Sequence, residues 1–149
     1  LAPLAPLAPL APLAPPLPVG LEFLAAVPGM DVTQGLGAVL GRRDRYLELL
    51  GKLMDTASDQ LAKLARDVEQ GQVSKVASVA HSVRGAAATL GVHGLADAAF
   101  RLEMKQPRES ASGAGADWLA DGLAAVHERL AELDAALAQA RRAQQAGPV

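Results

Sequence analysis

Hydrophobic residues recur every three or four positions along most of the chain, which is the spacing of one face of an α-helix. The longest run predicts a helix over about residues 42–70. Its apolar face contains Tyr46, Leu50, Leu53, Ala57, Leu61, Leu64 and Val68. A second long run predicts a helix over about residues 117–143, with Asp117 as its N-cap. Its apolar face contains Leu119, Leu123, Val126, Leu130, Leu133, Leu137 and Ala140.

Two further helices are predicted between these long ones. Gly71 and Gly91 bound the first, over about residues 72–90. The second covers about residues 93–105, and Pro107 prevents its continuation. Its inward residues are Leu95, Ala98, Ala99 and Leu102. The glycine- and serine-rich stretch that follows, QPRESASGAGA, is predicted to be a flexible loop.

A short helix is also predicted ahead of the four main ones. It covers about residues 31–40, with Asp31 as its N-cap and Gly41 as its stop. No stretch alternates between apolar and polar residues for long enough to predict a β-strand. The fold class is therefore all-α, an antiparallel four-helix bundle over residues 28–145, with a tail at 146–149.

The N-terminal residues follow a different pattern. Residues 1–15 are five repeats of Leu-Ala-Pro, and proline at every third position favours polyproline II over helix or sheet. We interpret residues 1–18 as a semi-rigid linker and residues 19–27 as a lead-in to the bundle. The alternative is that a ridge of leucines docks on the bundle or on a neighbour. Those leucines are Leu1, Leu4, Leu7, Leu10 and Leu13.

Composition narrows the classes of function. Half of the 149 residues are hydrophobic but only four are aromatic, so the core is aliphatic. A net charge of −2 gives no basic excess for nucleic acid or anionic lipid, and the absence of cysteine excludes thiol chemistry and cysteine-based zinc sites. No apolar run is long enough for a membrane span. We expect a monomeric, cytoplasmic domain, and the initial leucine suggests a piece of a longer protein.

His81 lies on an unusual face of the helix predicted over 72–90. The predicted core face comprises Val76, Val79, Val83, Ala86, Ala87 and Leu90. At 100° per residue, His81 lies about 180° from the centre of that face, which excludes a core histidine. Its neighbours on the outer face are small, namely Ser74, Ser78, Gly85 and Ala88. A glycine inside a helix costs about 1 kcal/mol relative to alanine, but small residues let a partner's backbone approach the imidazole. An ordinary surface histidine remains the alternative.

The sequence HSVRGAAATLGV, followed by Leu95 and by RLE ending at Glu103, resembles the motif of histidine phosphotransfer (HPt) domains. In that motif a histidine is followed, after two intervening residues, by Lys or Arg and then by Gly, and a second glycine stands six positions after the first. The segment PGMDVTQGLGAVLGRRDRYLELLGKL is similar to the leader of HPt domains in hybrid sensor kinases. The resemblance covers about residues 28–140.

The resemblance implies a phosphoryl carrier in two-component signalling. His81 would accept a phosphoryl group at Nε2 from an aspartyl phosphate on one receiver domain and pass it to another. Arg84 would offset the phosphoryl charge, while Ser78, Gly85 and Ala88 would contact the receiver. Mg²⁺ would belong to the receiver, so neither a cofactor nor a metal is expected here.

Glu103 is the candidate for orienting His81. His81 is ten residues before Gly91 and Glu103 is nine after Gly94, so both lie at a similar height beside the turn. Family members often carry Gln or Glu at the matching position. The alternative is a solvated glutamate.

The other histidines and other classes of protein fit less well. His93 lies in the predicted turn and is expected to cap the following helix or meet water, and His127 is expected at the surface. A chemotaxis-kinase phosphotransfer domain and a purely structural helical module remain alternatives. A dimerisation-and-phosphoacceptor domain would follow its histidine with an acidic residue, and no glycine-rich phosphate loop of a kinase is present.

Overall fold

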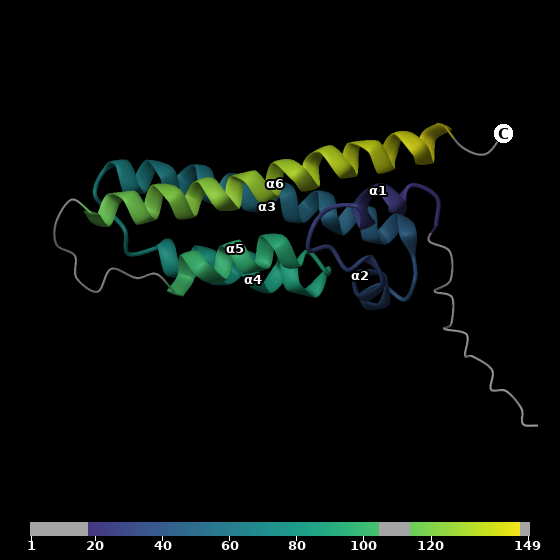
Figure 1. The fold of residues 1–149 in the computed structure, drawn as a ribbon, viewed down its shortest axis with the longest axis horizontal. Helices are drawn as coiled ribbons and strands as arrows, with labels where there is room; N and C mark the ends of the chain where they lie inside the picture. Colours follow the sequence, from purple (N-terminus) through teal and green to yellow (C-terminus); the bar gives the residue numbers. More distant parts are fainter. Residues whose placement is uncertain (1–17, 105–113, 147–149) are drawn as a thin grey trace, which may run out of the picture.

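The computed structural model describes residues 18–104 and 114–146 of the chain. This part is all helical and contains no strand, which confirms the predicted fold class (Figure 1). The helices are α1 (Leu21–Ala25), α2 (Val32–Ala38), α3 (Arg43–Glu69), α4 (Val76–Thr89), α5 (His93–Met104) and α6 (Ala114–Ala146). Residues 1–17 of the linker predicted over 1–18, and most of the predicted loop after α5, lie outside the described residues.

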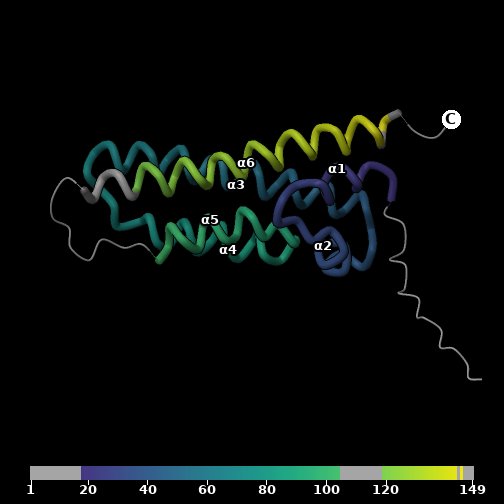
Figure 2. The backbone as a smooth tube through the Cα atoms, viewed as in Figure 1, coloured from purple at the N-terminus to yellow at the C-terminus, as the bar shows by residue number. Residues whose placement is uncertain are grey.

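The four long helices form the bundle. Each packs against two others, because α3 contacts α4 and α6, and α5 also contacts α4 and α6. Figure 2 shows α3 and α6 along one side of the bundle and α4 and α5 along the other, with α1 and α2 gathered at one end. Helix α6 extends past α4 and α5 toward this end, where α1 packs against it.

The core agrees with the predicted apolar faces in α3, α5 and α6, apart from Val68 and Leu123, which are half-buried. In α4 the predicted face is partly wrong. Ala80 is buried in place of Ala86, which is exposed, and Val79 is half-buried. The buried stripe of α4 is rotated toward α5, which packs more closely against it than α3 does.

Alanines make up much of the buried surface of α4 and α5, the two helices that pack most closely. The buried alanines of the two helices are Ala80, Ala87, Ala96, Ala98 and Ala99. Such short side chains allow the two helix backbones to lie close together. The pair therefore forms a tightly packed base under the outer face of α4.

One additional helix and the starts of two others differ from the sequence prediction. The lead-in contains α1, whose Leu21 and Leu24 are fully buried, although five residues are too few to give a periodic signal. Helix α4 begins at Val76, because residues 72–75 are all exposed and no packing supports another turn. Helix α6 begins at Ala114, so Asp117 lies inside the helix and does not provide its N-cap.

The segment before α2 fixes the turn between α4 and α5. The amide of Asp31 donates to the carbonyl of Gly91 over 2.8 Å, and the amide of His93 donates to the carbonyl of Gly29 over 2.8 Å. The carboxylate of Asp31 also accepts from the amide of Gln34 over 3.0 Å, which confirms the predicted N-cap of α2. Backbone pairing on both sides of the turn thus sets how α4 and α5 lie relative to each other.

Tyr46 holds the same turn from inside the core. Its hydroxyl donates to the carbonyl of Leu90 over 2.7 Å, at the end of α4. Burial raises the pKa of the Tyr46 phenol well above its ordinary value, and the negative charge of Asp31 adds to the shift in pKa. Gly35 of α2 lies directly against this contact, so that a Cβ on it would collide with the Leu90 carbonyl and the Tyr46 ring.

Candidate functional site

The outer face of α4 carries the candidate residues that the sequence pointed to. The His81 side chain is 65% exposed, which agrees with its predicted place away from the core. Ser78 and Gly85, one turn before and one turn after it, are also exposed. Ala88 is half-buried, and its carbonyl accepts a hydrogen bond from Nε2 of Gln34 over 3.0 Å. The exposed part of this face is therefore centred on His81.

Glu103 reaches His81 from α5. Its Oε1 lies 2.9 Å from Nδ1 of His81, and its side chain is only 18% exposed. The two helices leave the turn in opposite directions, so residues at similar distances from the turn lie side by side. The contact that the sequence suggested between these two residues is therefore present in the structure.

Arg84 lies beside both residues, and His81, Arg84 and Glu103 together form a cluster. Its Nε is 3.2 Å from Oε2 of Glu103, and one of its terminal nitrogens is 3.1 Å from Nδ1 of His81. A guanidinium only donates and a carboxylate only accepts, so Nδ1 cannot serve both neighbours as a hydrogen-bond partner. The shorter contact to the charged carboxylate favours the tautomer with the proton on Nδ1. Arg84 then lies beside the ring and forms an ion pair with Glu103.

Gly85 has no packing role in the fold. A Cβ placed on it would meet no atom within 4 Å, in contrast to the collisions at Gly35. Its carbonyl accepts from the hydroxyl of Thr89 over 3.0 Å, a bond that alanine at position 85 would leave intact. The open space above Gly85 lies one helical turn from the imidazole.

Comparison with known proteins decides the family. The model of the Hpt domain family matches residues 48–143, which is more than half of the chain and includes His81, Arg84 and Glu103. The chain belongs to the Hpt domain family. No curated protein and no solved structure matches it significantly.

Membership establishes the general role of this Hpt domain. It is a phosphocarrier rather than an enzyme, it serves histidine phosphotransfer in phosphorelays, and its partners are receiver domains. None of the helices in the described residues is both long and apolar enough to cross a bilayer. Within these same residues, no group of three or more His, Cys, Asp or Glu side chains could hold a metal ion.

The other two histidines of the Hpt domain lie away from this cluster. His93 is the first residue of α5, and its Nε2 lies 2.6 Å from the side-chain oxygen of Gln34. It therefore contacts α2, a partner that the sequence did not suggest. His127 is exposed on α6, as predicted.

Phe100 is a member of the cluster that the sequence analysis missed. The guanidinium carbon of Arg84 lies 5.1 Å from the centroid of its ring. The available signal was its spacing, because Phe100 precedes Glu103 by three residues and so shares a face of α5 with it. An isolated aromatic residue on an exposed helix face is too common for that spacing to single it out.

Proposed function

We propose that this chain is a phosphorelay intermediate in which His81 accepts a phosphoryl group from a receiver-domain aspartate and passes it to the aspartate of another receiver. The observation that carries the proposal is the contact of Glu103 with Nδ1 of the exposed His81. A neutral imidazole with its proton on Nδ1 has its free electron pair on Nε2. The nitrogen that attacks is then the one that Glu103 does not engage.

The transfer step needs no separate proton donor or acceptor. The Nε2 lone pair of His81 forms a bond to phosphorus while the bond from phosphorus to the aspartyl oxygen breaks, and the aspartate leaves as a carboxylate. The imidazole keeps its Nδ1 proton and gains positive charge, which the carboxylate of Glu103 offsets over 2.9 Å. The reverse step to a second receiver uses the same groups, which suits a reversible carrier.

Arg84 has a separate part in this proposal. Its guanidinium is beside the imidazole and remains 35% exposed, so it can offset the charge on the phosphoryl oxygens as they arrive. Ser78, Gly85 and Ala88 provide the surface for the receiver. The open space over Gly85 allows the receiver's backbone to approach the imidazole closely.

The proposal also concerns the receiver domain and the longer protein that would contain this chain. The acidic cluster and Mg²⁺ that assist phosphoryl transfer would be on the receiver, so this chain needs no cofactor of its own. We place the chain in a bacterial hybrid sensor histidine kinase, as a monomeric domain on the cytoplasmic side with no contact to the membrane. The gene sequence upstream of the codon for Leu1 tests this context, because it would encode a kinase core and a receiver.

The function is tested by incubating the chain with a receiver domain that carries radiolabelled phosphate on its aspartate. We expect acid-labile label on the parent chain and none on His81→Gln, with the same helical circular dichroism. His127→Gln is the matched control, because His127 is also exposed but lies on α6, and it should take up label at the parent rate. Label retained by His81→Gln would overturn the assignment of His81. If several receivers leave the parent chain unlabelled, a structural helical module becomes the better interpretation.

A further inference from the structure

Phe100 has no evident role in the core. It lies on α5 with 43% of its surface exposed, and a large apolar side chain gains little stability at such a position. The guanidinium carbon of Arg84 lies 5.1 Å from its ring centroid, which is within the range of a cation–π interaction. The ring therefore contacts a cation, Arg84, that also contacts both His81 and Glu103.

This contact restricts where Arg84 can be. A free arginine side chain samples many rotamers, and ordering it costs conformational entropy. Here the aromatic face of Phe100 covers the guanidinium while Glu103 binds it through an ion pair of 3.2 Å. Because Phe100 and Glu103 are three residues apart on α5, they engage the same guanidinium from neighbouring positions.

We propose that Phe100 is a positioning residue for phosphoryl transfer, which acts by holding Arg84 against the imidazole of His81. The inference rests on the proposed function of His81. An arginine that is already in place offsets the charge of the arriving phosphoryl group without first being ordered. The aromatic face is the property that matters, since an aliphatic side chain of similar size offers no such site for a cation.

The role can be separated from receiver binding with a small donor, phosphoramidate. The Nε2 lone pair of His81 forms a bond to phosphorus, the phosphorus–nitrogen bond breaks, and ammonia leaves with the electron pair of that bond. The donor enters as the zwitterion, so the leaving group already carries its protons. No protein surface takes part, and a change in rate then reports on the cluster around His81 alone.

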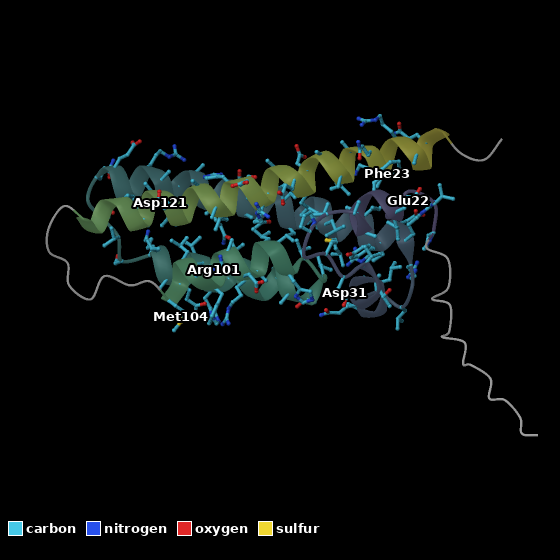
Figure 3. The ribbon with its side chains drawn as sticks, viewed as in Figure 1. Glu22, Phe23, Asp31, Arg101, Met104 and Asp121 are labelled. Carbon is cyan, nitrogen blue, oxygen red and sulfur yellow. The ribbon has the colours of Figure 1, made fainter. Side chains whose placement is uncertain are left out.

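Three variants test the proposal by their initial rate of labelling at His81. Phe100→Leu should be slower than the parent by about two- to five-fold, the factor expected for an exposed cation–π contact. Phe100→Tyr keeps the ring and should restore the rate. Phe23→Leu is the matched control, because Phe23 is similarly exposed, at 37%, and lies on α1. Figure 3 shows Phe23 toward the opposite end of the bundle from Met104, the last residue of α5.

A double-mutant cycle with Arg84 distinguishes positioning from a merely structural role. Arg84→Ala alone should slow labelling by about tenfold, as expected for loss of a charged hydrogen-bonding group. In the Arg84→Ala background, Phe100→Leu should cause no further loss. In the parent, the Arg84 side-chain protons should show an upfield ring-current shift by nuclear magnetic resonance that Phe100→Leu removes and Phe100→Tyr retains.

The outcomes separate this inference from the proposed function. Parent-like labelling of Phe100→Leu, or an equal further loss in the Arg84→Ala background, would overturn the role of Phe100 and leave that of His81 intact. If the parent takes up no label at His81 from either phosphoramidate or a receiver, the proposed function is wrong and this inference fails with it.

Discussion

The Glu103 carboxylate lies 2.9 Å from Nδ1 of His81, although the two residues are 22 positions apart in the chain. One residue belongs to α4 and the other to α5, and the backbone bonds around Gly91 fix how these helices pair. A single hydrogen bond across this contact decides which imidazole nitrogen carries the proton. The tautomer of His81 therefore depends on the packing of two helices.

Replacing Glu103 by alanine should slow phosphorylation of His81 by a receiver about tenfold, the effect of losing a charged hydrogen-bond partner. Glu103→Gln should lose less, because its side-chain oxygen still accepts from Nδ1. Nitrogen chemical shifts of the His81 ring report the tautomer directly. A Glu103→Ala chain that keeps both the parent tautomer and the parent rate would contradict the orienting role.

Two helical glycines should respond in opposite ways to alanine. Gly35→Ala should lower the free energy of unfolding by about 1–3 kcal/mol, because the new Cβ collides with the Leu90 carbonyl and with Tyr46. Gly85→Ala should raise it by up to about 1 kcal/mol, since nothing lies within 4 Å of its Cβ and alanine favours the helix. Urea unfolding of both variants measures the difference, and a destabilised Gly85→Ala would show that position 85 has a packing role.

A bulky cation at position 85 should separate folding from transfer. Gly85→Arg should leave the free energy of unfolding unchanged or raised by up to about 1 kcal/mol, because the site is open and arginine favours helices. Transfer from a receiver should be much slower, since the new side chain occupies the path to His81. Initial rates of label transfer measure this effect. Transfer at the parent rate would contradict the explanation of Gly85 by close approach.

Tyr46 should make the protein less stable in alkali. Its pKa is raised in the folded state by burial, so above about pH 10 the unfolded chain loses the phenolic proton while the folded chain keeps it. The free energy of unfolding should then fall as pH rises, by up to about 1.4 kcal/mol per pH unit from this group. Tyr46→Phe should be less stable by about 1 kcal/mol at pH 8, where it lacks the bond to Leu90, and the gap should narrow above pH 10. Urea unfolding at pH 8, 10 and 11 measures both effects, and a gap of constant size would contradict this account.

The N-terminal residues should divide into a dispensable part and an essential one. Removal of residues 1–17 should leave thermal stability and bimolecular transfer from a free receiver unchanged, because the bonds at Pro18 and Val19 remain. Leu24→Ala should lower the free energy of unfolding by about 2–5 kcal/mol, since Leu24 is fully buried. A loss of several degrees in Tm on removing 1–17 would instead show that the leucine ridge packs on the bundle.

The sequence could predict those features in which a signal accumulates over many residues. The core faces of α3 and α6 repeat over several turns, so residues such as Leu61 and Leu133 were placed correctly. The contact of His81 with Glu103 could be anticipated because equal distances from one turn imply equal heights along antiparallel helices. The first prediction depended on helix geometry alone, and the second also drew on the resemblance, because family members often carry Gln or Glu at the matching position.

Features that depend on one particular contact could not be predicted. Ala80 and Ala86 carry the same short side chain, so the sequence alone could not show that Ala80 is buried and Ala86 exposed. Helix α1 has five residues and is stabilised by Leu21 and Leu24 against the bundle, not by its own periodicity. The position of Phe100 under Arg84 likewise depends on side-chain directions that only the packed helices define.

The alanines buried in α4 and α5 have a consequence for the entropic cost of binding a partner. An alanine has no side-chain rotamers. The packed alanines of α4 and α5 beneath His81 therefore lose almost no configurational entropy when another protein binds. The entropic cost of association then comes mainly from ordering the few long side chains around His81. One of these is Arg84, which Phe100 and Glu103 already restrain. The surface around His81 is therefore ordered before a receiver domain arrives, and ordering it takes little of the free energy of binding.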